Sequence, residues 1–163
     1  MSTDDEVDLI IDAWARQRPD IDFAPLDVFS RLRRIARRLD AVRGGAFGRS
    51  DLDTWEFDVL STLRRSGDPH QLSPKHLVTA TMVTSGTMTN RLDRLVERGL
   101  VERRVDPNDG RGVVVQLTDE GLRRVDQAML DLVEAEDERL SALTPQQQVQ
   151  LGTLLRQLGE GFR

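Results

Sequence analysis

The stretch SGTMTNRLDRLVERGLVERR, residues 85–104, combines two properties that rarely occur in one helix. Its first residues are small or carry hydroxyl groups, and such residues favour turns and helix caps over helix interiors. Behind them, apolar side chains recur at the spacing of an amphipathic helix, namely Met88, Leu92, Leu95 and Val96. The pattern predicts a helix that one face holds to a core, with a small, polar leading end and an arginine-rich outer face.

The flanking residues predict a shorter helix before this one and a β-hairpin after it. Serine, threonine and glycine stand where helix caps require them, and β-branched residues mark the strands. The first expected element is a helix from Pro74 to about Thr81, capped by Ser73, and a three-residue turn separates it from the central helix between Thr84 and Gly99. Two strands follow at 100–106 and 113–118, around a turn at 107–110. The second strand places Val113, Val115 and Leu117 on one face. This order is that of a winged helix-turn-helix.

Amphipathic helices are expected on both sides of this centre, so the fold class is mainly α, with a small β part (α+β). The expected helices are 3–18 with Thr3 and Glu6 as a capping box, 26–42, 52–65, 119–140 after Thr118, and one starting at Thr144-Pro145, with RGGAFG (43–48) as a loop. The domain plan is an N-terminal extension at 1–25, helices for the core and a dimer region at 26–66, the winged helix-turn-helix at 67–118 and C-terminal dimerisation helices at 119–163.

Composition excludes several classes of protein. With 163 residues, of which 31% are charged and 38% apolar, the chain is long enough for one globular domain with extensions. It contains no cysteine, which rules out disulfides, thiolate nucleophiles and cysteine-type zinc sites. The acidic N-terminus and the absence of a long apolar run predict a cytoplasmic protein without membrane contact. The net charge of −5 does not suggest a nucleic-acid partner, but a local positive face can coexist with it.

The central helix has the side chains that a helix needs in the DNA major groove. Such a helix leads with its N-terminal turns, where small residues allow close approach and free amides favour phosphate. Opposite the apolar stripe lie Thr87, Asn90, Arg91 and Arg94, and asparagine and arginine match base edges through paired hydrogen bonds. Arg111, between two glycines at the hairpin tip, suits the negative potential of a minor groove.

Another interpretation of the same residues is a protein-interaction module, because winged helices also serve that role, with ordinary caps and a solvated arginine face. An enzyme has no support, since no catalytic set or paired carboxylates stand out and the loop GGAFG lacks the lysine of a phosphate-binding loop. His70 and His76 are poor metal ligands without nearby cysteine. We therefore expect no metal and no cofactor.

Residues 82–121, MVTSGTMTNRLDRLVERGLVERRVDPNDGRGVVVQLTDEG, resemble the signature region of the MarR family of bacterial transcriptional regulators. The resemblance implies a homodimer held by its terminal helices and a pseudo-palindromic double-stranded DNA operator. Two residues depart from the family pattern, namely Gly110, where a second arginine is common, and Val78, where a smaller residue is usual. With the helix face, the resemblance implies DNA contacts by Ser73, Thr84, Ser85, Gly86, Thr87, Thr89, Asn90, Arg91, Arg94, Asp109, Arg111 and Gly112.

The segments IDAWARQRPDIDFAP (11–25) and WEFDVLSTLRRSG (55–67) resemble the urate-responsive branch of that family, the UrtR or PecS-like group. That resemblance implies a repressor that a small anionic aromatic ligand such as urate releases from DNA. The implied ligand-binding residues are Trp14, Asp58, Arg91 and Arg103. A structural interpretation remains open for two of them, because Trp14 could pack in a core and Asp58 could pair with an arginine on the surface.

Overall fold

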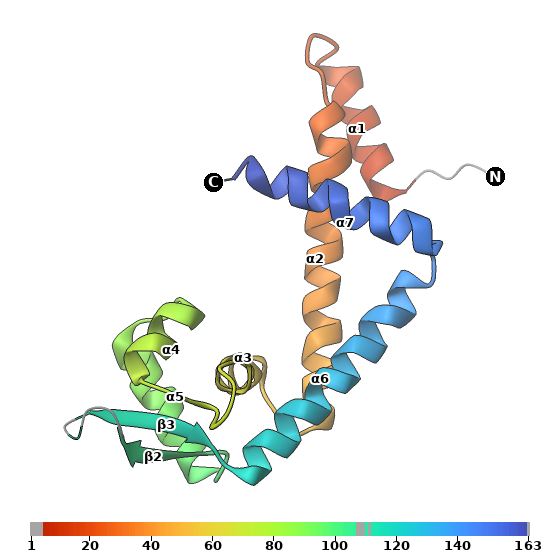
Figure 1. Ribbon diagram of the computed structural model, residues 1–163. Coiled ribbons are helices and arrows are strands. Elements are labelled where there is room, and N and C mark those ends of the chain that lie inside the picture. The colour runs from red at the N-terminus through yellow and green to blue at the C-terminus, as the bar shows by residue number, and fades with distance from the viewer. Residues whose placement is uncertain (1–4, 107–109, 111, 163) are drawn as a thin grey trace. The chain divides into compact units, whose positions relative to one another are not determined.

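The computed structural model describes residues 5–106, 110 and 112–162 (Figure 1). The elements are α1 (Glu6–Gln17), α2 (Ala24–Arg49), α3 (Thr54–Arg65), β1 (Gln71–Leu72), α4 (Pro74–Thr81), α5 (Ser85–Glu97), β2 (Val101–Val105), β3 (Val113–Leu117), α6 (Asp119–Leu140) and α7 (Pro145–Glu160). They confirm a mainly α fold with a small antiparallel sheet. The chain divides into two compact units, Met1–Val42 and Arg43–Arg163. None of the helices described is long and apolar enough to cross a membrane.

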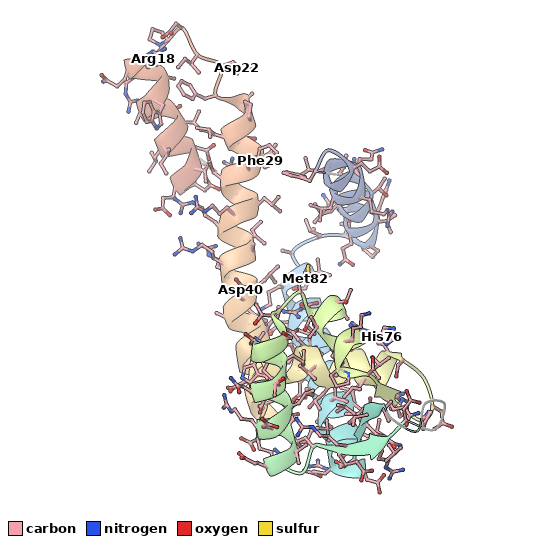
Figure 2. All side chains as sticks on the ribbon, turned by 90° about the vertical axis from the view of Figure 1, so that its left-hand side faces the viewer. Arg18, Asp22, Phe29, Asp40, His76 and Met82 are labelled. Carbon is pink, nitrogen blue, oxygen red and sulfur yellow. The ribbon has the colours of Figure 1, made fainter. Side chains whose placement is uncertain are left out.

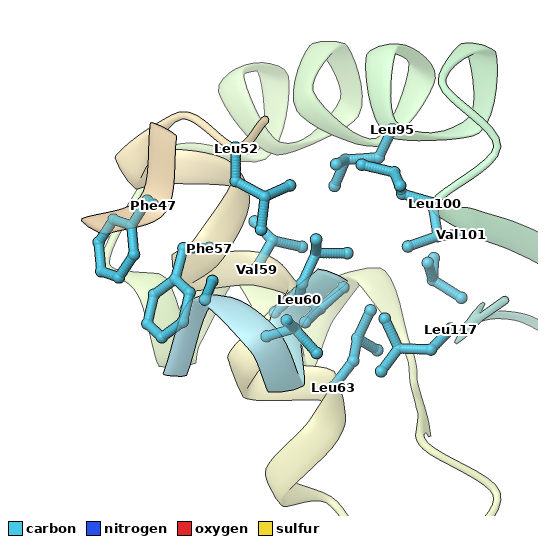
Figure 3. Packing of buried hydrophobic residues seen from close by; sticks show 14 of the residues in the cluster. Phe47, Leu52, Phe57, Val59, Leu60, Leu63, Leu95, Leu100, Val101 and Leu117 are labelled. Carbon is cyan, nitrogen blue, oxygen red and sulfur yellow. The ribbon is translucent and has the colours of Figure 1, made fainter. Parts of the chain in front are cut away.

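The core of the second unit is built from apolar side chains of its helices and sheet (Figure 3). The expected stripe of α5 is largely confirmed, because Met88, Leu92 and Leu95 are buried, whereas Val96 is 39% exposed. The other buried members include Phe47, Phe57, Leu60, Leu63, Leu77, Leu100, Val115 and Leu117. This stripe attaches α5 to the unit and leaves its opposite face outside the core.

Four helices of the second unit, α4, α5, α6 and α7, start at the caps that the sequence predicts. Thr84 Oγ1 accepts a hydrogen bond from the Thr87 amide at 3.2 Å, and Thr118 Oγ1 accepts one from the Gly121 amide at 3.0 Å. Ser73 caps α4 and Thr144 caps α7 in the same way. Gly99 follows α5 with a φ of 67°, a left-handed conformation that glycine adopts without strain.

The sheet contains a strand that the sequence pattern does not reveal. The predicted hairpin is present, with β2 and β3 antiparallel and Arg103 opposite Val115. Residues 71–72, expected as part of a turn-rich connection, pair with β3 on its other side, so the strand order is β1-β3-β2. The expected inward face of β3 is only partly correct, because Val113 is 47% exposed at the outer end of the hairpin, where the core no longer reaches.

Helix α2 is longer than the sequence predicts, and the expected loop at 43–48 is wrong. The helix continues through Gly44 and Gly45 to Arg49. Glycines inside a helix cost about 1 kcal/mol each relative to alanine, and α2 contains three of them, including Gly48. Burial offsets this cost, because Phe47 is fully buried and its ring stacks on Phe57 with centroids 4.0 Å apart. Tertiary packing therefore overrides the local preference of the glycines.

The first unit consists of α1 and most of α2. Helix α1 starts at Glu6, later than expected, under a capping box formed by Asp5 and Asp8. Thr3, the expected cap, lies outside the described residues. Arg31 of α2 reaches across to α1, donating to Asp5 Oδ2 at 2.9 Å and to Asp8 Oδ1 at 2.7 Å. These ion pairs, with the buried side chain of Val7, hold the two helices together.

Candidate nucleic-acid interface

The outer face of α5 presents the polar side chains that the sequence predicts. Thr87, Asn90 and Arg94 are exposed, and Arg91 is half-buried. The buried stripe on the opposite face is at most 1% exposed. Because one face is anchored and the other is open, α5 can present donors and acceptors to a partner without rearrangement of the core.

The leading end of α5 is compact and polar. Thr84 Oγ1 and Thr87 Oγ1 lie 2.9 Å apart, and Thr89 Oγ1 donates to the Ser85 carbonyl at 3.0 Å. Ser85 and Gly86 are exposed beside them. The positive end of the helix dipole and the small side chains make this turn suitable for a phosphate group.

Helix α4 and the turn to α5 complete the helix-turn-helix. Ser73 caps α4, and its Oγ also lies 3.0 Å from Nδ1 of His76. The three residues between the helices include Met82, which has a φ of 53° and is 91% exposed (Figure 2). Ser73 and the N-terminal turn of α5 thus both lie at helix starts of the motif.

The wing is described except at its tip. The amide of Asp106 donates to the Gly112 carbonyl at 2.9 Å, which closes the hairpin beyond the last paired residues of β2 and β3. Asp109 and Arg111, which the sequence assigns to the tip, lie outside the described residues. Gly112 is described at the base of the tip.

Two arginines of the α5 face lie against an aromatic ring that was not among the predicted site residues. The guanidinium carbon of Arg94 is 4.9 Å from the ring centroid of Trp55 on α3, and that of Arg91 is 5.4 Å away. The ring and the α5 face line a surface hollow of about 270 Å³, formed by Trp55, Thr87, Asn90, Arg91 and Arg94. In the sequence, Trp55 falls on the apolar face of the helix expected at 52–65, and that position indicates only a core residue.

The residues assigned to a ligand site are divided between the two units. Trp14 lies in the first unit, where it is 51% exposed and 6.1 Å from the ring of Phe23, so its interpretation as a buried core residue is wrong. Asp58, in the second unit, is exposed, and no described residue forms an ion pair with its carboxylate. Arg103 Nη2 instead donates to Asp93 Oδ1 at 2.7 Å.

A network of charges ties the C-terminal end of α5 to the rest of the unit. Arg98 donates to Glu56 Oε2 and to Asp51 Oδ2, the latter at 2.6 Å, and Arg124 of α6 donates to the same Asp51 oxygen at 2.7 Å. Glu56 is fully buried, and its Oε1 has no hydrogen-bond partner among the described residues.

The hydrogen bonds and charges of this network shift the pKa values of Asp51, Arg98 and Arg124. The hydrogen bond from Arg124, followed by the charge of Arg98, holds the pKa of the Asp51 carboxyl below its usual range. The hydrogen bond to Glu56 raises the pKa of Arg98. Asp51 and Arg98 therefore stay charged at neutral pH, and their ion pair fixes the end of α5. Among the described residues, no group of three histidine or acidic side chains is placed to hold a metal ion.

Comparison with known proteins identifies this arrangement. Residues 50–112 match the model of the MarR family. The HTH-type transcriptional regulator PecS of Dickeya dadantii is 37% identical over 150 residues, which cover 92% of this chain and 90% of that protein. An E. coli MarR mutant complexed with operator DNA has a similar structure, with 28% identity, a TM-score of 0.66 and coverage of 85% of this chain and 99% of that one.

A further similar structure is that of Bordetella bronchiseptica BpsR, whose DNA binding is regulated by 6-hydroxynicotinic acid. It is 30% identical with a TM-score of 0.64, covering 81% of this chain and 92% of that one. The helix-turn-helix with its wing agrees with these relatives, which are regulators rather than enzymes. The chain therefore belongs to the MarR family and is a DNA-binding transcriptional regulator, as the sequence predicted.

Proposed function

We propose that this regulator is a repressor that binds a pseudo-palindromic operator as a homodimer and is released by a small planar anion such as urate. One observation carries the DNA-binding part of the proposal. The outer face of α5 exposes Thr87, Asn90 and Arg94 directly opposite a buried stripe. Such a helix can enter a major groove as a rigid part of its domain.

The α5 face offers direct readout of bases together with phosphate contacts. Asn90 can pair with adenine, and Arg91 and Arg94 can pair with guanine, each through two hydrogen bonds. Phosphates would be held by the cap residues Ser73 and Thr84 and by the small residues Ser85, Gly86 and Thr89. The wing residues Asp109, Arg111 and Gly112 are assigned to the adjacent minor groove, where arginine is attracted by the negative potential.

The homodimer is supported by the terminal helix. None of the described residues of α7 is buried. Four of its apolar side chains are 40–71% exposed, namely Val149, Leu151, Leu154 and Leu155. A second copy would cover such a face, and a two-fold dimer places two α5 helices on half-sites about 10 bp apart.

A planar anion is the ligand class that the four assigned residues fit. The half-exposed indole of Trp14 offers a stacking face, and the guanidinium groups of Arg91 and Arg103 offer charge and paired donors. Asp58 would set the position of one arginine. BpsR, which is similar in structure, is described as regulated by 6-hydroxynicotinic acid, another planar aromatic acid. A ligand that engages Arg91 removes it from DNA and shifts the population toward the free protein.

Footprinting of the chain on its own promoter region tests the proposal. We expect a protected palindrome with half-sites about one helical turn apart, a dimer by light scattering, and loss of protection when urate is added. A monomer that protects no palindrome would contradict the DNA-binding part. Retention of the footprint at millimolar urate and at millimolar concentrations of related purines and aromatic acids would contradict only the ligand part.

A further inference from the structure

Trp55 of α3 contacts the two arginines of the α5 face through its ring rather than through a charged group. Its indole is half-buried and packs on the edge of the hydrophobic core. The guanidinium carbons of Arg91 and Arg94 both lie within 6 Å of the ring centroid, the range of a cation–π interaction. The ring therefore lies between the core and the polar face of α5.

The orientation of this ring is determined by the cap of α3. Indole Nε1 donates a hydrogen bond to Asp53 Oδ2 at 3.2 Å. Asp53 is the N-cap of α3, and its amide donates to Glu56 Oε2 at 2.9 Å. Because Glu56 is buried and also accepts from Arg98, the indole is attached to a rigid part of the unit.

Arg91 and Arg94 differ from the other arginines near α5. Arg98 and Arg103 each donate to a carboxylate. In contrast, the side chains of Arg91 and Arg94 form no ion pair or hydrogen bond with any described residue. A guanidinium over a ring keeps its N–H donors free at its edge, since the contact uses the face of the group. These two arginines are thus oriented while their donors remain available.

We propose that Trp55 is a positioning residue for operator recognition, which orients Arg91 and Arg94 before DNA binds. This inference rests on the proposed role of the α5 face in contacting DNA. Ordering a long, flexible side chain at an interface costs free energy on binding, and a chain ordered in advance avoids part of that cost. The same preorganisation favours the contacts that need fixed geometry, which are those to base edges rather than to phosphates.

The test removes the ring but keeps an apolar residue at position 55. Trp55→Leu retains an apolar side chain at the edge of the core, and Trp55→Phe restores a ring for the two guanidinium groups. We expect Trp55→Leu to weaken operator binding by about five- to thirty-fold, the range for losing two such contacts. Trp55→Phe should fall between Trp55→Leu and wild type, because a phenyl ring keeps a face for the guanidinium groups but loses the Nε1 hydrogen bond to Asp53. Binding to random duplex should change little, because every positive charge is still present.

A double-mutant comparison separates positioning from a merely structural role. In a background that carries Arg91→Ala and Arg94→Ala, Trp55→Leu should have no further effect on operator affinity, because the groups that it orients are gone. An equal loss in that background, or wild-type affinity of Trp55→Leu alone, would overturn the inference. The proposed function itself fails by a different result, namely wild-type operator affinity of the double arginine variant.

Discussion

Arg103 of β2 and Asp93 of α5 form an ion pair in which Arg103 Nη2 lies 2.7 Å from Asp93 Oδ1. Both side chains are about half exposed, at 42% and 48%. The pair joins β2, the first strand of the wing, to α5. An anion that binds Arg103 must share or break this contact, and doing so would change the link between the wing and α5.

We therefore predict that Arg103→Ala weakens the ligand response while the protein stays folded. An exposed ion pair contributes at most about 1 kcal/mol, so the melting temperature should change little. A coupling of about 1–3 kcal/mol between ligand and DNA would be lost, which raises the urate concentration needed for release by roughly tenfold. Operator release by urate, followed by fluorescence anisotropy, measures this shift.

Arg104→Ala is the matched control for that experiment. Arg104 is the next residue of β2 and pairs with Glu102 on its own strand rather than with α5. Its replacement removes the same charge from the wing but leaves the Arg103–Asp93 pair intact. If both variants respond to urate equally, Arg103 has no specific part in the ligand site.

A second prediction concerns base recognition by Asn90. This exposed side chain is outside the core, so Asn90→Ala should keep the stability of the wild type. Loss of a paired contact to a base should cost roughly 1–3 kcal/mol of operator affinity and relax the preference at one base pair. Arg111→Ala, at the wing, should instead weaken binding more uniformly across sequences. Titration of operator variants measures both, and wild-type affinity for Asn90→Ala would refute the placement.

A third prediction follows from the buried carboxylate under α5. Arg98→Ala leaves Glu56, which is fully buried, without its charged partner. Breaking such a pair costs roughly 3 kcal/mol, at the lower end of the known range because the Arg98 side chain is 30% exposed. Urea unfolding measures the loss. The double variant Arg98→Met with Glu56→Leu should recover most of it, whereas an equal loss in both variants would mean that the charge of Glu56 is not the cause.

The parts of the fold that the sequence predicts correctly depend on local interactions. Thr84, Thr118 and Thr144 cap helices because each hydroxyl bonds to an amide three residues later, and that spacing is visible in the sequence. The stripe of α5 is visible for the same reason. A strand of two residues, 71–72, has no such pattern, because pairing with a distant strand creates it.

Contacts between distant segments explain what the sequence did not reveal. The loop expected at 43–48 is helical because Phe47 packs on Phe57, a contact that glycine propensity cannot predict. The site shows the same limit. Sequence reasoning placed Arg91 on the polar face, but not the ring of Trp55 beneath it, nor Asp93 as the partner of Arg103. Helix faces can be assigned from spacing, whereas the pairs that orient side chains depend on tertiary structure.

A fourth prediction is a loss of stability in acid that Glu120 helps to cause. Hydrogen bonds from Arg123 and then from Arg124 lower the pKa of this carboxyl from 4.5 to about 2. Because the folded-state pKa is lower than the unfolded one, the contribution is present above pH 4.5 and is lost as the pH falls toward 2. Glu120→Gln should flatten the decrease of the melting temperature in this window. Glu134→Gln, on the same helix but without an ion pair among the described residues, should leave the slope unchanged.

The last prediction tests a close approach of the Leu100 backbone to Gly121. Gly121 lies in the first turn of α6, and a Cβ at this position would lie 2.0 Å from the Leu100 carbonyl oxygen. Alanine at a helical position normally adds about 1 kcal/mol of stability over glycine. At Gly121 the clash is with backbone that cannot move aside, so Gly121→Ala should instead cost roughly 1–3 kcal/mol.

Gly45→Ala is the control for this substitution, because Gly45 is also helical and a Cβ there meets nothing within 4 Å. It should raise the free energy of unfolding by about 0.5–1 kcal/mol. Opposite signs for the two variants in chemical denaturation would show that α6 starts where the Leu100 carbonyl leaves no room for a side chain. Stabilisation by both would mean that α6 can shift away from Leu100, the residue that connects the end of α5 to β2.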